Sequence, residues 1–281
     1  RRLRLLMNDE LFTRGPRGMM PTPRAHEVAR RLHVLLPQLA DVINPSDFDP
    51  ELSERVFAIA CVPYLSTMLV PRLAADLAVS APHANLDIRL LYSSVVDDLD
   101  SGRLDVALGN FRRIPPRLIT EELLRDDYVW VMRVGNPAAG RKPTLEMLST
   151  VPHVDLLIDG AVVNPIDSYD VRQGLERLVI QNSMAATEEA FGDAGLRREV
   201  RYHAPDSIAA LAIVARTDAA CLVPVSIARM FERNFDLVLF EPPYAATALN
   251  IQMLYHQEYG ARPAVSWLLD RIRAALPDKA G

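Results

Sequence analysis

The stretch Val56-Phe57-Ala58-Ile59-Ala60-Cys61 is a short apolar run of the kind that forms a buried strand, and it begins the alternation that decides the fold. Residues 65–80 show helical periodicity, residues 86–91 form a second apolar run, residues 95–101 form a second helical segment, and residues 104–109 form a third strand. Strands that alternate with helices in this way pair in parallel, with helices on the faces of the sheet. The sequence therefore predicts an α/β fold.

Charge divides the chain into a basic head and an acidic body. The 281 residues suffice for two compact lobes, or one large domain, plus a helical appendage. The net charge of −5 argues against a protein that coats nucleic acid over its whole surface. Residues 1–43, however, contain eight arginines and four acidic residues, so they carry +4 and the remainder −9. This distribution is typical of a DNA-contacting module attached to a body with another task.

The cysteines and the hydropathy of the chain indicate the cellular compartment in which the protein acts. Cys61 and Cys221 are far apart in apolar runs, so we expect no disulfide framework, and a reducing cytoplasm is compatible with the chain. No apolar stretch approaches the roughly 20 residues that span a bilayer, and nothing resembles a signal peptide. We therefore expect a cytoplasmic protein without a membrane partner.

The basic head contains a turn that fits a DNA-binding wing, Asp9-Glu10-Leu11-Phe12-Thr13-Arg14-Gly15-Pro16-Arg17-Gly18-Met19-Met20-Pro21-Thr22-Pro23. Its Pro-x-Gly sequence at 16–18 allows a hairpin-like reversal. Arg14 and Arg17 place cations at the base and tip, where they reach phosphate or enter a minor groove. Thr22-Pro23 is a helix N-cap followed by a proline at the first helical position. On residue chemistry alone, an ordinary turn with solvated arginines fits equally well.

After this cap, apolar residues recur at steps of three and four: Ala25, Val28, Leu32, Leu35 and Leu39. The pattern is typical of a helix that pairs with a partner helix, although a helix lying on the protein's own core also produces it. Pro37 predicts a kink or break near Leu36. The turn-rich residues 44–50 mark a domain boundary.

Leu11, Phe12, Arg14, Gly18, Pro21 and Thr22 fill the pattern Leu-Phe-x-Arg-x-x-x-Gly-x-x-Pro-Thr, which resembles the end of the winged helix-turn-helix of LysR-type transcriptional regulators. Met after the glycine and Pro after the threonine look most like the nodulation-regulator and aromatic-degradation-regulator branch. Residues 101–109, Ser-Gly-Arg-Leu-Asp-Val-Ala-Leu-Gly, are similar to the family's effector-domain signature Gly-x-x-Asp-Leu-Ala-x-Gly. Further landmarks follow in order at residues 195–200, 211–218 and 267–269.

The resemblance implies a domain plan for the whole chain. Residues 1–22 would be the end of a recognition helix and the wing of an incomplete winged helix-turn-helix, N-terminally truncated, with Arg1, Arg2, Arg4, Arg14 and Arg17 as DNA contacts. Residues 23–44 would be the dimerising linker helix and residues 45–54 a hinge. Residues 55–281 would form a two-lobed effector-binding domain similar to type 2 periplasmic binding proteins.

In this plan the first lobe takes residues of about 55–134 and 246–281, and the second takes about 135–245. A strand at 128–133 would lead into the crossover. The second lobe would contain strands at 154–158, 199–203 and 219–223 and helices at 144–148, 187–194, 206–214 and 225–231. A strand at 249–255 and a helix at 265–276 would complete the first lobe. Residues of about 161–185 match no landmark, and we interpret them as an insertion or diverged loop near the mouth of the cleft.

The sequence contains few residue patterns that are typical of enzymes. The six histidines are scattered, without a pair at metal-ligand spacing. There is no Gly-x-Ser-x-Gly elbow, no phosphate-binding loop and no dinucleotide-binding glycine motif. We therefore expect no catalytic residue, no metal and no cofactor.

Ligands of open α/β sheets bind beyond the carboxyl ends of parallel strands. This rule, together with the resemblance, selects Val62, Pro63, Tyr64, Ser93, Ser94, Asn110 and Phe111 in the first lobe, and His203, Pro205, Asp206 and Ser207 in the second. The two serines and His203 would bind polar groups, and Tyr64 and Phe111 would wall a planar ring. As alternatives, Ser94 and Asp206 are helix caps and Phe111 is a core residue.

Two features of the sequence modify the prediction of the effector site. Val62-Pro63 stand where many relatives of the branch have Ser-Asp, which indicates a less polar or differently oriented effector. His153 matches a landmark of the branch, and we favour a packed histidine there. The chain is thus predicted to be a LysR-type regulator, homodimeric or homotetrameric, that binds promoter DNA and a small aromatic or organic-acid inducer. The alternative is a stand-alone small-molecule sensor of the same fold, which would not need the basic head.

Overall fold

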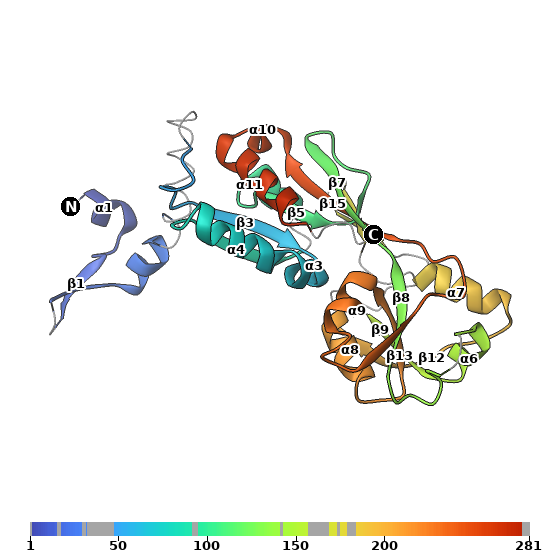
Figure 1. Cartoon of the computed structure of the whole chain (residues 1–281). Coiled ribbons are helices and arrows are strands. Elements are labelled where there is room, and N and C mark those ends of the chain that lie inside the picture. The colour runs from blue at the N-terminus through green and yellow to red at the C-terminus, as the bar shows by residue number, and fades with distance from the viewer. Residues whose placement is uncertain are drawn as a thin grey trace.

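A computed structural model describes residues 2–15, 18–29, 32, 48–91, 95–140, 143–156, 169–172, 175–178 and 184–276. Beyond the N-terminal head, the chain forms two α/β lobes, each built on its own five-stranded sheet (Figure 1). In the described part of the chain, no helix is long and apolar enough to cross a membrane.

The first lobe, lobe I, has the strand order β4-β3-β5-β15-β7. These strands are β3 (Val56–Cys61), β4 (Asn85–Leu90), β5 (Val106–Gly109), β7 (Leu118–Asp126) and β15 (Leu249–His256). β3 pairs in parallel with β4 and β5, whereas β15 runs antiparallel to both β5 and β7. The parallel arrangement predicted from the apolar runs is confirmed.

The helices of lobe I are α3 (Pro63–Met68), α4 (Val70–Ser80), α5 (Val95–Asp100), α10 (Gln257–Gly260) and α11 (Pro263–Ala274). The single helix predicted over 65–80 is therefore two helices that meet at Leu69. Pro71 lies in the first turn of α4, where its missing N–H leaves no backbone donor to continue α3.

The second lobe, lobe II, has the strand order β12-β9-β13-β8-β14. Its strands are β8 (Tyr128–Arg133), β9 (Pro152–Leu156), β12 (Glu199–Ala204), β13 (Ala220–Pro224) and β14 (Leu237–Phe240). Its helices are α6 (Leu145–Ser149), α7 (Met184–Asp193), α8 (Ser207–Val214) and α9 (Val225–Phe231).

The crossover to lobe II lies earlier than the sequence predicted. β8 pairs with β13 and β14, so it belongs to lobe II, and the expected lobe I boundary near residue 134 is wrong. The chain leaves lobe I between β7 and β8, at Asp126–Tyr128. The side chains of β8 are nearly all buried, so their apolar character alone does not distinguish between the two sheets.

A β-hairpin lies within the segment that we interpreted as a diverged loop. β10 (Tyr169–Arg172) pairs antiparallel with β11 (Leu175–Leu178), and β11 pairs with β6 (Phe111–Arg112). The described residues of this segment therefore form a small three-stranded sheet with β6 and are not irregular.

The head contains α1 (Arg2–Met7) and a hairpin of β1 (Phe12–Gly15) and β2 (Gly18–Pro21). Gly18 has φ +108°, a conformation that L side chains rarely adopt, which explains glycine at the reversal. The Thr22 hydroxyl accepts from the Ala25 amide at 3.0 Å, and residues 23–29 are helical. The predicted hairpin and N-cap are confirmed.

Each lobe contains a buried arginine paired with an aspartate. In lobe I, Arg55 Nη2 lies 2.7 Å from Asp105 Oδ1, and Asp105 Oδ2 accepts from the Ala58 amide at 2.9 Å. In lobe II, Arg198 binds both oxygens of Asp155 at 2.9 Å. The lobe I pair joins the residues just before β3 and β5, and the lobe II pair joins β9 to the residue just before β12. Each pair therefore stabilises the pairing of two neighbouring strands.

The chain packs onto lobe I before its first strand. The Phe48 ring lies 5.5 Å from the Trp267 ring and 6.3 Å from the Phe57 ring, measured between centroids. Phe48, within the segment 45–54 predicted as a hinge, is therefore in contact with the core of lobe I.

Candidate functional site between the lobes

The loop after β3 brings the first group of predicted residues to the boundary between the lobes. Val62 precedes α3, and Pro63 occupies its first turn without needing a hydrogen-bond partner for an N–H. Cα atoms of α3 lie within 8 Å of α8 and of α9, both in lobe II (Figure 1). The helix that follows β3 thus lies near the helix that follows β12 in lobe II.

Tyr64 and Asp126 connect the lobes at the first crossover. Asp126, at the end of β7, accepts from the Ser226 amide in the first turn of α9 at 3.3 Å. Burial raises the pKa of the Asp126 carboxyl. Burial, followed by the nearby Asp126 carboxylate, raises the pKa of the Tyr64 hydroxyl. Tyr64 is only 2% exposed, so its ring is part of the core of lobe I and presents little open face to a ligand.

Asn110 and Phe111 are held by the neighbouring strand β15. The Asn110 side-chain amide donates to the Asn250 carbonyl, and the Phe111 amide donates to Gln252 Oε1, both at 2.8 Å. The Phe111 side chain is 3% exposed. The structure therefore favours the alternative in which Phe111 is a core residue.

The lobe II group surrounds the start of α8. Asp206 accepts from the Ala209 amide at 2.8 Å, so it caps α8, as the alternative interpretation held. Ser207 is buried, whereas His203 and Pro205 are exposed. Ser93 and Ser94 lie outside the described residues. Of the predicted set, His203 and Pro205 present the most accessible surface.

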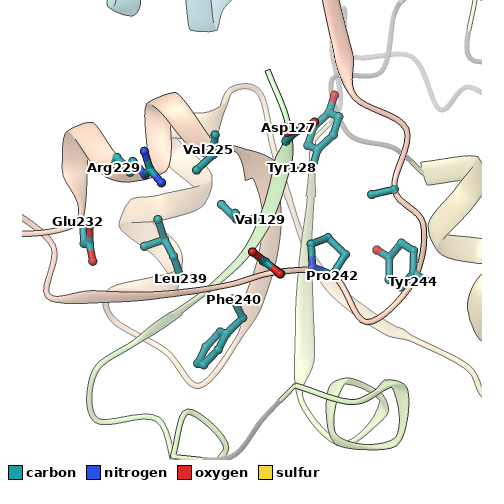
Figure 2. A pocket seen from close by; sticks show the side chains of 12 residues that line it. Asp127, Tyr128, Val129, Val225, Arg229, Glu232, Leu239, Phe240, Pro242 and Tyr244 are labelled. Atoms are coloured by element: carbon teal, nitrogen blue, oxygen red, sulfur yellow. The ribbon is translucent and has the colours of Figure 1, made fainter. Parts of the chain in front are cut away.

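A hollow that the sequence analysis did not identify lies beside both crossovers (Figure 2). Its volume is about 590 Å³, within the usual range for small-molecule sites. The hollow is lined by both crossovers and by α9. The first crossover contributes residues 127–129, and the second contributes residues 239–242, Tyr244 and Ala246. Val225 and Arg229 of α9 and Glu232 at its C-terminus complete the lining. A second hollow of about 780 Å³ adjoins it, lined by residues 143–146 and 239–243. Of the predicted effector-binding residues that the structure describes, none lines either hollow.

A polar network fixes the second crossover to lobe II. The Trp130 indole N–H donates to the Tyr244 hydroxyl at 3.2 Å, and the Tyr244 and Thr187 hydroxyls lie 2.8 Å apart. Burial raises the pKa of Tyr244. The network joins β8, α7 and the segment that returns the chain to lobe I. No local sequence signal indicates it, because its three residues lie more than 50 positions apart.

His153 is a packed histidine, as we favoured. It is fully buried, its ring centroid lies 4.8 Å from that of Trp130, and its Nε2 lies 2.9 Å from the Leu148 carbonyl. Arg198 Nη1 approaches Nδ1 at 3.2 Å, which requires Nδ1 to accept and Nε2 to carry the proton. Burial, aided by the charge of Arg198, lowers the pKa of His153 to about 4.

The predicted DNA contacts are placed only in part. Arg14 lies exposed on β1, and Arg4 on α1 forms an exposed ion pair with Glu10 at 3.0 Å. Arg2 belongs to α1, and Arg1 and Arg17 are outside the described residues. Of the predicted dimer contacts, Ala25 and Val28 are half-buried, Leu32 is 40% exposed, and Leu35 and Leu39 are not described. The kink predicted near Leu36 also falls outside the described residues.

Among the described residues, no group of three His, Cys, Asp or Glu side chains is arranged to hold a metal ion. Cys61 and Cys221 are both free thiols with no exposed surface. Burial raises the pKa of Cys61 to about 12, which keeps it protonated and unreactive.

Comparisons of the chain with protein families, with curated proteins and with solved structures agree on one family. Residues 50–187 and 182–277 match the model of the LysR substrate binding domain. The HTH-type transcriptional activator NahR of Pseudomonas putida is 28% identical over 95% of this chain and 83% of its own length. The HTH-type transcriptional regulator SyrM of Rhizobium etli is 24% identical over 98% of this chain and 76% of its own length. A crystal structure of a probable transcriptional regulator from Pseudomonas aeruginosa, 28% identical, superposes with a TM-score of 0.69 over 97% of this chain and 84% of that one.

Proposed function

The chain belongs to the LysR family of transcriptional regulators, and from that premise we propose that its two-lobed domain binds a small aromatic or organic acid between the lobes. The observation that carries this proposal is the approach of α3 in lobe I to α8 and α9 in lobe II, beside the two crossovers that join the lobes. A ligand that binds one disposition of the lobes more tightly than another shifts the population between them. The relatives are regulators and not enzymes, and the alternative of a sensor without a DNA role is not favoured.

The head supports a role in DNA binding. Its hairpin presents Arg14 at an exposed position, and its capped helix starts directly after the hairpin. In our proposal the head contacts the phosphate backbone of promoter DNA, the protein acts in the cytoplasm, and a pair of linker helices joins two copies in a homodimer or homotetramer. Ala25, Val28, Leu32, Leu35 and Leu39 would form the seam between these helices.

The effector is tested by thermal unfolding with benzoate as an aromatic acid, succinate as an aliphatic acid and benzyl alcohol as an uncharged aromatic control. A ligand that binds only the folded protein stabilises it by about 2.7 kcal/mol at 100 times its Kd. We expect one acid to raise the Tm and His203→Ala to reduce the increase. The matched control is Arg72→Ala, at an exposed position on α4. No change of Tm with either acid would contradict the proposed ligand class.

DNA binding is tested by electrophoretic mobility shift across salt concentrations, with the DNA upstream of the coding sequence as probe. If Arg14 contacts a phosphate, Arg14→Ala weakens binding and reduces the slope of log K against log salt by about 1. Arg72→Ala should leave both unchanged. An unaltered slope in Arg14→Ala would remove this residue from the DNA contacts.

A further inference from the structure

The two lobes connect the middle one of their three parallel strands, β3 and β9, to the next helix in different ways. In lobe I, β3 ends at Cys61 and α3 begins at Pro63. In lobe II, β9 ends at Leu156, and the next described helix, α7, begins at Met184. Strand-to-helix connections in α/β units usually contain about 2–6 residues. The lobe II connection is much longer, and the β10–β11 hairpin lies within it.

This hairpin pairs with lobe I. β11 joins β6 in antiparallel register, with Glu176 opposite Arg112 and Arg177 opposite Phe111. β6 follows β5 of lobe I after a single residue, Asn110. The hairpin thus emerges between two elements of lobe II and forms a backbone ladder with a strand that continues from lobe I.

β6 is itself fixed to lobe I. The Phe111 amide donates to Gln252 Oε1 of β15 at 2.8 Å, and its side chain is buried in the core. The Asn110 side chain donates to the Asn250 carbonyl on the same strand at 2.8 Å. A hairpin that pairs with β6 is therefore held against the body of lobe I.

We propose that the β10–β11 hairpin is a strap between the lobes that closes the effector site at the carboxyl end of β5. The inference rests on the proposed function for the identity of the site, since ligands of α/β folds bind beyond the carboxyl ends of the strands. Separation of the lobes at this side requires the β11–β6 ladder to break. That ladder contains two residue pairs, Glu176 with Arg112 and Arg177 with Phe111. So short a ladder opens reversibly.

The strap also restricts the size of the ligands that can enter the site. A ligand entering beside β5 must fit beneath the paired hairpin or wait for the ladder to open. The chain therefore selects small effectors through its own backbone, in addition to any side chain that contacts them.

The test compares Arg177→Pro with Arg177→Ala. β11 is the central strand of its three-stranded sheet, where a proline removes a ladder hydrogen bond, whereas alanine keeps the backbone intact. Spin labels on His83→Cys in lobe I and Arg233→Cys in lobe II, both exposed positions, report the distance between the lobes. The native Cys61 and Cys221 have no exposed surface and do not take the label.

We expect Arg177→Pro to broaden the distance distribution and to speed exchange of the Arg112 amide about ten-fold, the effect of losing one or two net hydrogen bonds, whereas the Phe111 amide, which donates to Gln252 of β15, should exchange as in the parent protein. Arg177→Ala should match the parent protein in both measurements. An unchanged distribution and unchanged exchange in Arg177→Pro would overturn the strap.

A second variant tests the pairing itself. Arg112→Cys combined with Glu176→Cys places two thiols at opposed positions, so mild oxidation should form an intramolecular disulfide that narrows the distance distribution. Each single substitution is the control. Absence of the cross-link, or a cross-link that leaves the distribution unchanged, also overturns the proposal. Neither measurement needs an effector, so their failure is separate from failure of the ligand screen.

Discussion

In lobe I, β3 lies between the parallel strands β4 and β5, and in lobe II, β9 lies in the same way between β12 and β13. Each sheet continues with two antiparallel strands, and each lobe buries one arginine–aspartate pair. The surroundings of the two pairs differ. Around Arg198 lie a buried histidine, His153, and Glu188, whose side chain is 45% exposed, whereas Asp105 binds Arg55 and a backbone amide. The same topology therefore holds polar cores of different composition, and only the one in lobe II includes a buried histidine among the described residues.

The largest effect is expected from breaking the lobe I pair. Asp105→Ala removes the carboxylate that binds Arg55 and the Ala58 amide, both buried, and should cost about 3–5 kcal/mol in urea unfolding. The matched control is Asp87→Ala, which removes the partly exposed pair with Arg89 in the same lobe and should cost less than about 1 kcal/mol. Equal costs for the two variants would contradict a structural role for Asp105.

The second prediction concerns pH and lobe II alone. The pKa of His153 is lowered to about 4 in the folded protein, from about 6.5 in the unfolded chain. The unfolded state therefore binds an extra proton between these values, so stability falls as the pH drops from about 6.5 to 4, by about 3 kcal/mol in total.

Unfolding at several pH values, followed by the fluorescence of Trp130 in lobe II with Trp267→Phe as background, measures this slope. His153→Gln should flatten it. His203→Gln, at an exposed position in the same lobe, is the control and should keep the slope of the parent protein. A slope that survives in His153→Gln would assign the pH response to other groups.

The two lobes offer matched glycines for a third prediction. Gly102 follows α5 and Gly195 follows α7, and each has φ +66°. Alanine in this left-handed conformation costs about 1–2 kcal/mol. The two costs should be similar, because the Cβ of Gly102→Ala would only reach ordinary contact with the Tyr259 ring, at 3.4 Å, and nothing lies within 4 Å at Gly195. Thermal unfolding of the two variants side by side measures both costs, and a much larger cost at Gly102 would show that the ring does not accommodate the added Cβ.

The smallest effect is expected at the second crossover. Tyr244→Phe removes the hydroxyl that bonds to Trp130 and Thr187 and should cost about 1 kcal/mol. A double-mutant cycle with Thr187→Val separates this contact from other effects, and the two losses should be non-additive. Strict additivity would show that the two hydroxyls do not interact in solution.

Elements with strong local signals were predicted well from the sequence. The helix at 225–231 was predicted with the bounds of α9, and the wing hairpin follows from its glycine and its N-cap. β7 was missed because it is an edge strand whose side chains are largely exposed and charged, so it lacks an apolar run. β6, β14 and the β10–β11 hairpin were missed because each is too short to show a period.

The candidate site was predicted less well than the fold. The strand-end rule selects residues by their position after a strand, and in the structure the helix after β3, α3, lies near α8 and α9. It says nothing about burial, so it did not separate the accessible His203 from the buried Tyr64 and Phe111. The hollow beside the crossovers joins residues 127–129 to residues 239–246, which no local pattern connects.

By itself, the sequence determined the α/β alternation, the basic head with its wing, and the likeness to a family of regulators. These properties depend on periodicity, capping and turn residues, which act over a few neighbouring positions. Only the tertiary structure decided that β8 belongs to lobe II, that Tyr64 is buried, and that a hairpin from lobe II pairs with β6. Strand partners and burial depend on contacts between residues distant in the chain, and such contacts leave no local signal in the sequence.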